Sequence, residues 1–272
     1  MALREFKTTF EGMQLQCWQG GQGFPIIMMH GSGAGASTMG NFKRIIEPLT
    51  QKYSILAADL IGFGQSGRKS TEPYFDVDMW VRQGEKMIEL IGGGPVGVIG
   101  HSLSGALALK MAARNSNVAG VLTTGTMGAT FKVEGTTRGW TFPETRDQLE
   151  KIAAGMVYDK SQADEEEVER RAKVLYEPGY RDYFKLMFAL SRQAYIDETA
   201  LSEEEIRKIS CPVILMHGEN DVSFTPEQTT LALARALPNA DAWILKKCAH
   251  GVALDRPAAF LAAVDLLFGS RK

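Results

Sequence analysis

The chain has 272 residues, of which 44% are hydrophobic and 23% are charged, and its formal net charge is −2. This length and hydrophobic content suit one large domain rather than two small ones. No long basic run is present, which argues against a nucleic-acid-binding protein, and we expect a small-molecule partner.

The sequence shows no sign of secretion or of membrane attachment. The first residues lack the apolar core of a signal peptide, and no apolar stretch is long enough to cross a bilayer. The three cysteines, Cys17, Cys211 and Cys248, are too widely spaced for a disulfide framework or a paired zinc motif. We therefore expect a cytoplasmic protein that does not bind a membrane.

Short apolar runs alternate with helical patterns in the first half of the chain. This alternation is typical of an α/β fold, with a mostly parallel central sheet flanked by helices. In chain order, we predict a strand at 25–29, a helix at 42–49, a strand at 53–60, a helix at 79–90, a strand at 96–100, a helix at 103–113 and a strand at 118–123.

The pattern changes in residues 128–202, where charged helical stretches replace the strand-like runs. Ser161 and Ser202 each begin a capping-box pattern that predicts a helix start. Strands resume at 212–216 and 242–245, and a last helix is predicted at 258–268. We therefore expect a core in two parts, 1–127 and 203–272, with a helical lid at 128–202.

The predicted lid carries aromatic residues that could roof an apolar pocket, although each could equally pack the lid against the core. They are Phe131, Trp140, Phe142, Tyr176, Tyr183, Phe184 and Phe188.

Ser102 lies between the strand at 96–100 and the helix at 103–113. A serine on a sharp strand-to-helix turn between small residues is the nucleophile elbow of one class of hydrolases. Gly100 supplies the small residue before it, Ser104 stands where glycine is usual, and Gly105 follows. We predict that Ser102 is a nucleophile; the alternative is an ordinary helix-capping serine.

A serine hydroxyl needs a base, and the base needs a group that orients it. Asp221 follows the strand at 212–216, and His250 follows the strand at 242–245. The chain order of serine, acid and histidine is typical of this arrangement. We therefore predict a catalytic triad of Ser102, Asp221 and His250, with a turn aspartate and a loop histidine as the alternatives.

A glycine-rich loop at 30–35 follows the first predicted strand. A backbone N–H of such a loop, together with that of the residue after the nucleophile, can bind a developing oxyanion. We expect Ser32 and Leu103 to supply these amides. The glycine spacing fits neither a phosphate-binding loop nor a dinucleotide fold, and the histidines lack zinc-ligand spacing. We therefore expect no cofactor and no metal.

The whole chain is similar to the α/β-hydrolases, and within them it resembles the meta-cleavage product hydrolases. The similarity lies in residues 30–36, 41–42 and 157–171. Enzymes of that family hydrolyse a carbon–carbon bond in 2-hydroxy-6-oxo-dienoates, which are ring-opened aromatic catabolites. The resemblance implies this reaction for the chain and also implies a homodimer.

The resemblance also implies roles for single residues. Gly31, Gly33 and Asn41 are expected to line the substrate site, and Arg171 aligns with a family arginine that contacts substrate. A bidentate arginine is a suitable partner for a buried carboxylate.

The alternative for Arg171 is a helical ion pair with Glu167 on a solvated face. Arg170 and Arg192 are the substitutes if Arg171 does not bind substrate.

Four residues depart from the family pattern. Ala34 stands where proline is usual, His101 where asparagine is common, Ser104 where glycine is found, and Gly251 where tryptophan often follows the catalytic histidine. The departures at Ser104 and Gly251 suggest a reshaped pocket.

Other functions remain open on the same residues. A carboxylesterase or lactonase would need the triad but no carboxylate-binding arginine. A hydroxynitrile lyase or cofactor-independent oxygenase would use His250 and Asp221 without acylating Ser102. A ligand sensor would keep the pocket without catalysis.

Overall fold

The computed structural model of the chain describes residues 3–133 and 140–271. Strands in this part form one sheet in the order β1-β2-β4-β3-β5-β6-β7-β8. Their bounds are β1 (Arg4–Phe10), β2 (Met13–Gly20), β3 (Pro25–Met29), β4 (Ser54–Ala58), β5 (Val96–His101), β6 (Val118–Thr124), β7 (Val213–Gly218) and β8 (Ala240–Leu245). The strands β1 and β2 pair antiparallel, as do β2 and β4, and the other neighbours are parallel. The predicted fold class is confirmed.

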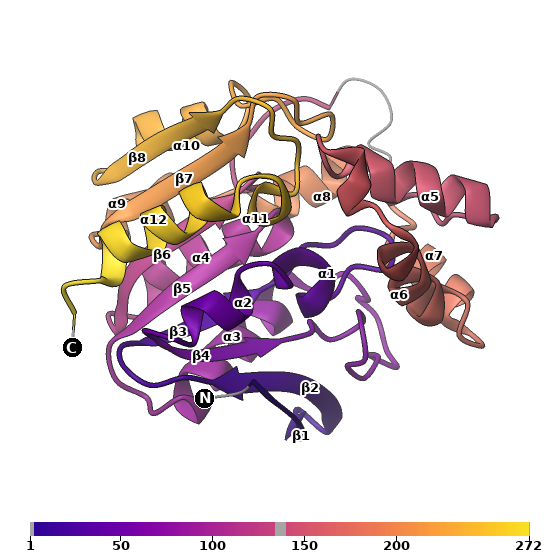
Figure 1. Cartoon of the computed structure of the whole chain (residues 1–272), viewed down its shortest axis with the longest axis horizontal. Coiled ribbons are helices and arrows are strands. Elements are labelled where there is room, and N and C mark those ends of the chain that lie inside the picture. The colour runs from indigo at the N-terminus through magenta and orange to yellow at the C-terminus, as the bar shows by residue number, and fades with distance from the viewer. Residues whose placement is uncertain (1–2, 134–139, 272) are drawn as a thin grey trace.

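Helices cover both faces of the sheet (Figure 1). On one face lie α3 (Val77–Leu90), α4 (Leu103–Arg114) and α10 (Thr230–Ala236). On the other lie α1 (Thr38–Phe42), α2 (Ile46–Leu49), α11 (Val252–Asp255) and α12 (Pro257–Phe268).

The parallel strands are apolar throughout because both of their faces are buried. In β3, Ile27 and Met29 pack into the core beneath α3 and α4, while Ile26 and Met28 pack into the core beneath α2 and α12. All four side chains are fully buried. Short apolar runs that do not alternate with polar residues are therefore the sequence pattern to expect for these strands.

The segment between β6 and β7 contains α5 (Arg146–Gly155), η2 (Lys160–Gln162), α6 (Glu165–Leu175), α7 (Tyr180–Met187), α8 (Arg192–Thr199) and α9 (Glu203–Lys208). No residue described between 128 and 202 belongs to a strand. In Figure 1, α5, α6 and α7 lie together at one side of the molecule, beyond α1. No helix in the described ranges combines the length and apolar character that a membrane span needs.

Two local predictions are wrong. The helix predicted at 42–49 is two short helices, because α1 begins earlier, at the Ser37 cap, and ends at Phe42. The helix cap predicted at Ser161 is Asp164, whose carboxylate accepts the Glu167 amide, while Ser161 lies in η2. The capping box at Ser202 is present.

Candidate active site

Ser102 lies on the corner between β5 and α4. Its backbone has φ 54° and ψ −115°, a strained conformation typical of a nucleophile at such a corner. A Cβ atom at Gly100 would lie 2.0 Å from the Ser104 carbonyl oxygen, and one at Gly105 would lie 2.1 Å from Thr126 Oγ1. Ser104 can replace the usual glycine because the tight contacts fall at Gly100 and Gly105.

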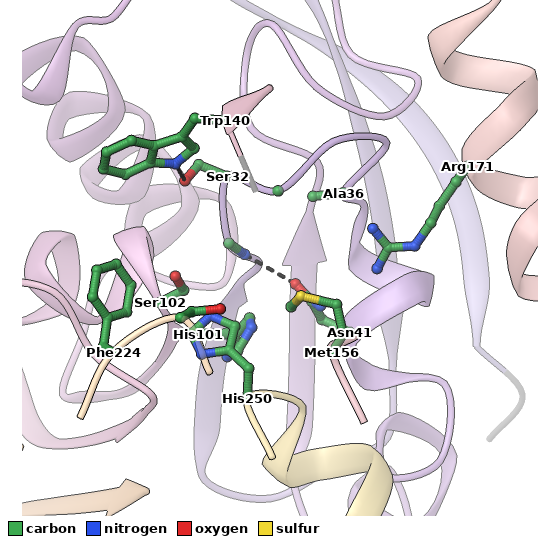
Figure 2. A pocket seen from close by; sticks show the side chains of 13 residues that line it. Ser32, Ala36, Asn41, His101, Ser102, Trp140, Met156, Arg171, Phe224 and His250 are labelled. Carbon is green, nitrogen blue, oxygen red and sulfur yellow. Dashed lines mark hydrogen bonds between the residues drawn. The ribbon is translucent and has the colours of Figure 1, made fainter. Parts of the chain in front are cut away.

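The structure brings Asp221 and His250 together from two loops. Asp221 follows β7 and His250 follows β8, and His250 Nδ1 is 2.7 Å from Asp221 Oδ2. The His250 ring and Ser102 line the same pocket, where Figure 2 shows them side by side with His101. The three residues predicted as a triad therefore meet at the carboxyl ends of their strands.

The Asp221 carboxylate is buried and held by several donors. Its Oδ1 accepts the amides of Ser223 at 2.7 Å and Phe224 at 3.3 Å. Burial alone would raise the pKa of Asp221, but the charge that His250 can carry and the hydrogen bonds from His217 and His250 outweigh it. The net effect holds the pKa well below the usual value, so Asp221 is ionised at neutral pH.

The loop after β3 carries one predicted oxyanion donor. The Gly31 amide donates to Asn41 Oδ1 over 2.9 Å, which ties this loop to α1 (Figure 2). The Ser32 amide makes no hydrogen bond within the described residues. Leu103 is the first residue of α4, where an amide has no partner inside the helix. Both predicted amides are therefore available beside Ser102.

Ser104, in the first turn of α4, ties this helix to the end of β3 and the loop that follows it. Its hydroxyl donates to the His30 carbonyl over 2.5 Å. The His30 ring is buried, with Nδ1 2.7 Å from the Gly31 carbonyl oxygen, and its Nε2 accepts the Leu60 amide at 2.9 Å. Burial lowers the pKa of His30, which favours the neutral ring that this arrangement requires.

The pocket at Ser102 gathers the predicted substrate-site residues. Its walls are formed by Gly31, Ser32, Gly33, Ala36, Asn41, His101, Ser102, Trp140, Met156, Arg171, Ser223, Phe224 and His250. These residues come both from the core and from the segment between β6 and β7, which supplies Trp140, Met156 and Arg171.

Arg171 reaches the pocket from α6, on the side opposite Trp140 and Phe224 (Figure 2). Its Nε donates to Glu167 Oε1 over 2.7 Å, and its Nη1 donates to the Ala34 carbonyl over 2.8 Å. Both charged side chains are only 3% exposed, so this helical pair does not lie on a solvated face. Arg171 Nη2 makes no hydrogen bond within the described residues and remains available to a ligand.

The two substitute arginines lie elsewhere. Arg170 pairs with Glu166 and Glu167 on α6, and Arg192 lies 3.3 Å from Thr141 Oγ1 beside a different hollow. Neither lines the pocket that contains Ser102.

Among the lining residues, the sequence-based prediction does not name Met156, Ser223 or Phe224, and it gives Ala36 no role. The Met156 carbonyl accepts the Gly251 amide over 2.7 Å, and a Cβ at Gly251 would lie 3.0 Å from that oxygen. The absence of a side chain at Gly251 therefore lets Met156 lie close to the loop that carries His250. Ser223 and Phe224 follow Asp221 so closely that their position after the acid could have indicated them.

Among the described aromatic residues of the predicted lid, Trp140 alone lines this pocket. Its Nε1 donates to Ser32 Oγ over 3.2 Å, and its ring stacks on Phe188. Phe142, Tyr183 and Phe184 are buried in the same hydrophobic core as the inward side chains of α3 and α4, and Tyr176 is about half exposed.

His101 also lines the pocket, at the position where the resembled family commonly has asparagine. Its Nδ1 lies 2.9 Å from Thr124 Oγ1, and its ring centroid is 4.6 Å from that of His250. Burial and the neighbouring His250 lower its pKa well below the usual value, so His101 is neutral. No group of three or more His, Cys, Asp or Glu side chains in the described ranges is placed to hold a metal ion.

The family model for the alpha/beta hydrolase fold matches residues 25–257. The chain belongs to this family. The match spans the Ser102 corner, both loops of the Asp221–His250 pair and the glycine-rich loop, so the geometry and the family assignment rest on the same residues.

Similar proteins within this family are hydrolases of ring-cleavage products. The 2-hydroxymuconate semialdehyde hydrolase of Pseudomonas sp. (strain CF600) is 27% identical over 255 residues, covering 93% of this chain and 89% of that protein. The 2-hydroxy-6-oxo-2,4-heptadienoate hydrolase of Pseudomonas putida F1 is 27% identical over 256 residues, covering 93% and 92%.

A solved structure of the meta-cleavage product hydrolase from Pseudomonas fluorescens IP01, complexed with acetates, superposes with a TM-score of 0.87 at 26% identity. The match covers 95% of each chain. The predicted resemblance to meta-cleavage product hydrolases is confirmed.

Proposed function

We propose that this α/β-hydrolase cleaves a carbon–carbon bond in a 2-hydroxy-6-oxo-dienoate, with Ser102 as nucleophile, His250 as base and Asp221 as its partner. The observation that carries the proposal is Arg171, a buried guanidinium with an unused N–H in the pocket of Ser102. A dienoate brings the carboxylate that such a group would bind.

A general esterase, the alternative function, would not need Arg171. A buried cation costs free energy unless it is paired. Glu167 supplies one partner, yet Arg171 Nη1 also binds the Ala34 carbonyl, which orients the guanidinium toward the pocket. Asn41 Oδ1 is occupied by the Gly31 amide, so its Nδ2 is left as a second donor on the same wall.

The arrangement suits a reaction in two stages. The substrate dienol first becomes its keto form as a proton leaves the 2-hydroxyl oxygen and one is added at C5, with His250 as the group that moves it. Ser102 Oγ then attacks the C6 carbonyl carbon while His250 takes its proton, and the amides of Ser32 and Leu103 bind the oxyanion.

The C5–C6 bond breaks when the oxyanion collapses. Its electron pair passes into the enone system, and the resulting dienolate takes the proton that His250 removed from Ser102 and leaves as the dienol. The acyl group stays on Ser102, and His250 is neutral again. Water, deprotonated by His250, attacks this ester and releases the carboxylic acid. No redox partner is needed, because the reaction adds only the elements of water.

We further propose that residues 128–202 act as a lid on a core formed by 1–127 and 203–272. Trp140 and Met156 of this segment line the pocket. Arg171 of the same segment donates a hydrogen bond to the Ala34 carbonyl in the loop after β3. A homodimer is proposed from the family resemblance.

Replacing Arg171 with methionine tests the proposed substrate class. We expect kcat/KM for a dienoate to fall about a hundredfold, since a hydrogen bond to a charged group is worth about 1.5–3 kcal/mol. Cleavage of a neutral nitrophenyl ester should change by less than about threefold. Arg170→Met is the matched control, because it removes a cation from the same helix outside the pocket.

Melting curves of the two variants show whether the fold is kept, and Arg171→Lys keeps the charge if the methionine variant is unstable. An Arg171→Met enzyme with full dienoate activity would favour the carboxylesterase or lactonase alternative.

A further inference from the structure

A second histidine contacts the carboxylate of the proposed triad. His217 lies near the end of β7 with its side chain fully buried, and its Nε2 is 3.0 Å from Asp221 Oδ2. The same oxygen receives His250 Nδ1 at 2.7 Å. Two imidazole rings therefore converge on one carboxylate oxygen.

The other contacts of His217 fix where its proton lies. Nε2 is 3.1 Å from the Phe224 carbonyl oxygen, which can only accept a hydrogen bond. Nε2 therefore carries the hydrogen, with the Phe224 carbonyl as one acceptor and Asp221 Oδ2 also within 3.0 Å. The Thr230 hydroxyl lies 2.8 Å from Nδ1 and can donate a hydrogen bond to it.

We propose that His217 is a positioning residue of the catalytic machinery, which donates the second hydrogen bond to Asp221 Oδ2 and so sets the charge and orientation that His250 meets. The inference rests on the proposed triad. Together with the two amides on Oδ1, His217 gives the carboxylate three donors besides His250. This fixed carboxylate holds His250 with its proton on Nδ1 and its Nε2 free for Ser102.

If His217 served only to fill space in the core, its contact with Asp221 would have no function. Thr230 and Phe224 already satisfy both nitrogens of His217, so a buried histidine at this position would be stable without the carboxylate. Loss of the His217 donor should therefore change the behaviour of His250 only if His217 is a positioning residue, and not if it serves only for packing.

The donor affects the pH dependence of the nucleophile. Asp221 and His101 face His250, and His250 and His217 face Asp221. The buried Cys248 thiol also lies within the field of Asp221, but burial raises its pKa to about 12 and keeps it uncharged. Without the His217 donor, more negative charge remains on Oδ2 and stabilises protonated His250. Only neutral His250 can accept the proton of Ser102, so the rate rises with pH as His250 loses its proton. This rise, the acid limb of the pH–rate profile, should therefore move to higher pH.

The matched pair His217→Gln and His217→Asn tests the proposal. A glutamine amide reaches about as far as Nε2 and can still donate to Asp221, while an asparagine amide reaches only to the region of Nδ1 and Thr230. The readout is the rate at which a serine-directed phosphonate labels Ser102 between pH 5 and 9, which does not depend on the natural substrate.

We expect His217→Asn to be labelled about tenfold more slowly at pH 7, with its acid limb displaced upward by about half a pH unit or more. His217→Gln should keep the wild-type limb. Equal profiles for the two variants, or an unmoved limb in His217→Asn, would overturn the positioning role. A wild-type protein that is not labelled would instead overturn the triad itself and, with it, this inference.

A measurement on the unaltered protein guards against unfolded variants. Nitrogen chemical shifts of 15N-histidine-labelled enzyme should show His217 protonated on Nε2 and unprotonated on Nδ1. The opposite tautomer would remove the donor and contradict the proposal.

Discussion

At the scale of single residues, the loop after β3 depends on one glycine for its contact with α6. Gly35 has φ +67°, and a Cβ atom there would lie 2.7 Å from Arg171 Cβ and 2.9 Å from Arg171 Cα. Gly33, two residues earlier, has nothing within 4 Å of such an atom and no positive φ. The close approach at Gly35 therefore sets how far Arg171 stands from the loop that carries the Ser32 amide.

These two glycines make a matched pair for a stability measurement. Gly35→Ala should lower the free energy of unfolding by about 2–5 kcal/mol, since a left-handed alanine costs about 1–2 kcal/mol and overpacking adds about 1–3 kcal/mol. Gly33→Ala should stay within about 0.5 kcal/mol of wild type. Urea unfolding of both variants decides the matter, and equal midpoints would show that the loop can move away from α6.

At the scale of elements, α6 links Arg171, which lines the pocket of Ser102, to the core. Asp164 begins the helix by accepting the Glu167 amide over 2.9 Å, and one turn later Glu167 accepts Arg171 Nε. The cap thus holds the turn that orients Arg171. Ser161, which the sequence pattern predicts as the helix cap, instead lies in η2 and donates a hydrogen bond from its hydroxyl to Asp159.

The cap assignment predicts unequal effects of two alanine substitutions. Asp164→Ala should lower the free energy of unfolding by about 1 kcal/mol, the usual value of a helix cap, and should raise KM for a dienoate because the turn holding Arg171 loosens. Ser161→Ala should change neither quantity appreciably. Denaturation and steady-state kinetics on the same preparations test this, and a larger effect at Ser161 would restore the capping box there.

At the scale of the whole molecule, the parallel strands and the positions of Ser102, Asp221 and His250 after strand ends could be predicted because each signal is local. Apolar runs mark the strands buried on both faces, and the residues with chemistry follow strand ends directly. The hairpin of β1 and β2 could not be predicted this way: β1 exposes polar side chains at the sheet edge, so its pattern is not an apolar run.

The contacts within the site were less accessible to sequence reasoning. Met156 lines the pocket because its carbonyl meets Gly251, and His217 meets Asp221 because β7 and the following loop fold back on each other. Such meetings depend on tertiary packing between distant or turned segments, and no spacing in the chain reports them. The alignment of Arg171 indicated a substrate contact but not its bond to the Ala34 carbonyl.

Carbon–carbon cleavage through Ser102 can be tested in one turnover experiment. Purified wild-type protein and Ser102→Ala are given a coloured ring-fission dienoate and, separately, a short-chain nitrophenyl ester. We expect wild type to bleach the dienoate at least about tenfold faster than it cleaves the ester, and we expect Ser102→Ala to lower the dienoate rate by about a thousandfold or more. Ester cleavage with an untouched dienoate, or unchanged dienoate turnover in Ser102→Ala, would contradict carbon–carbon cleavage through Ser102.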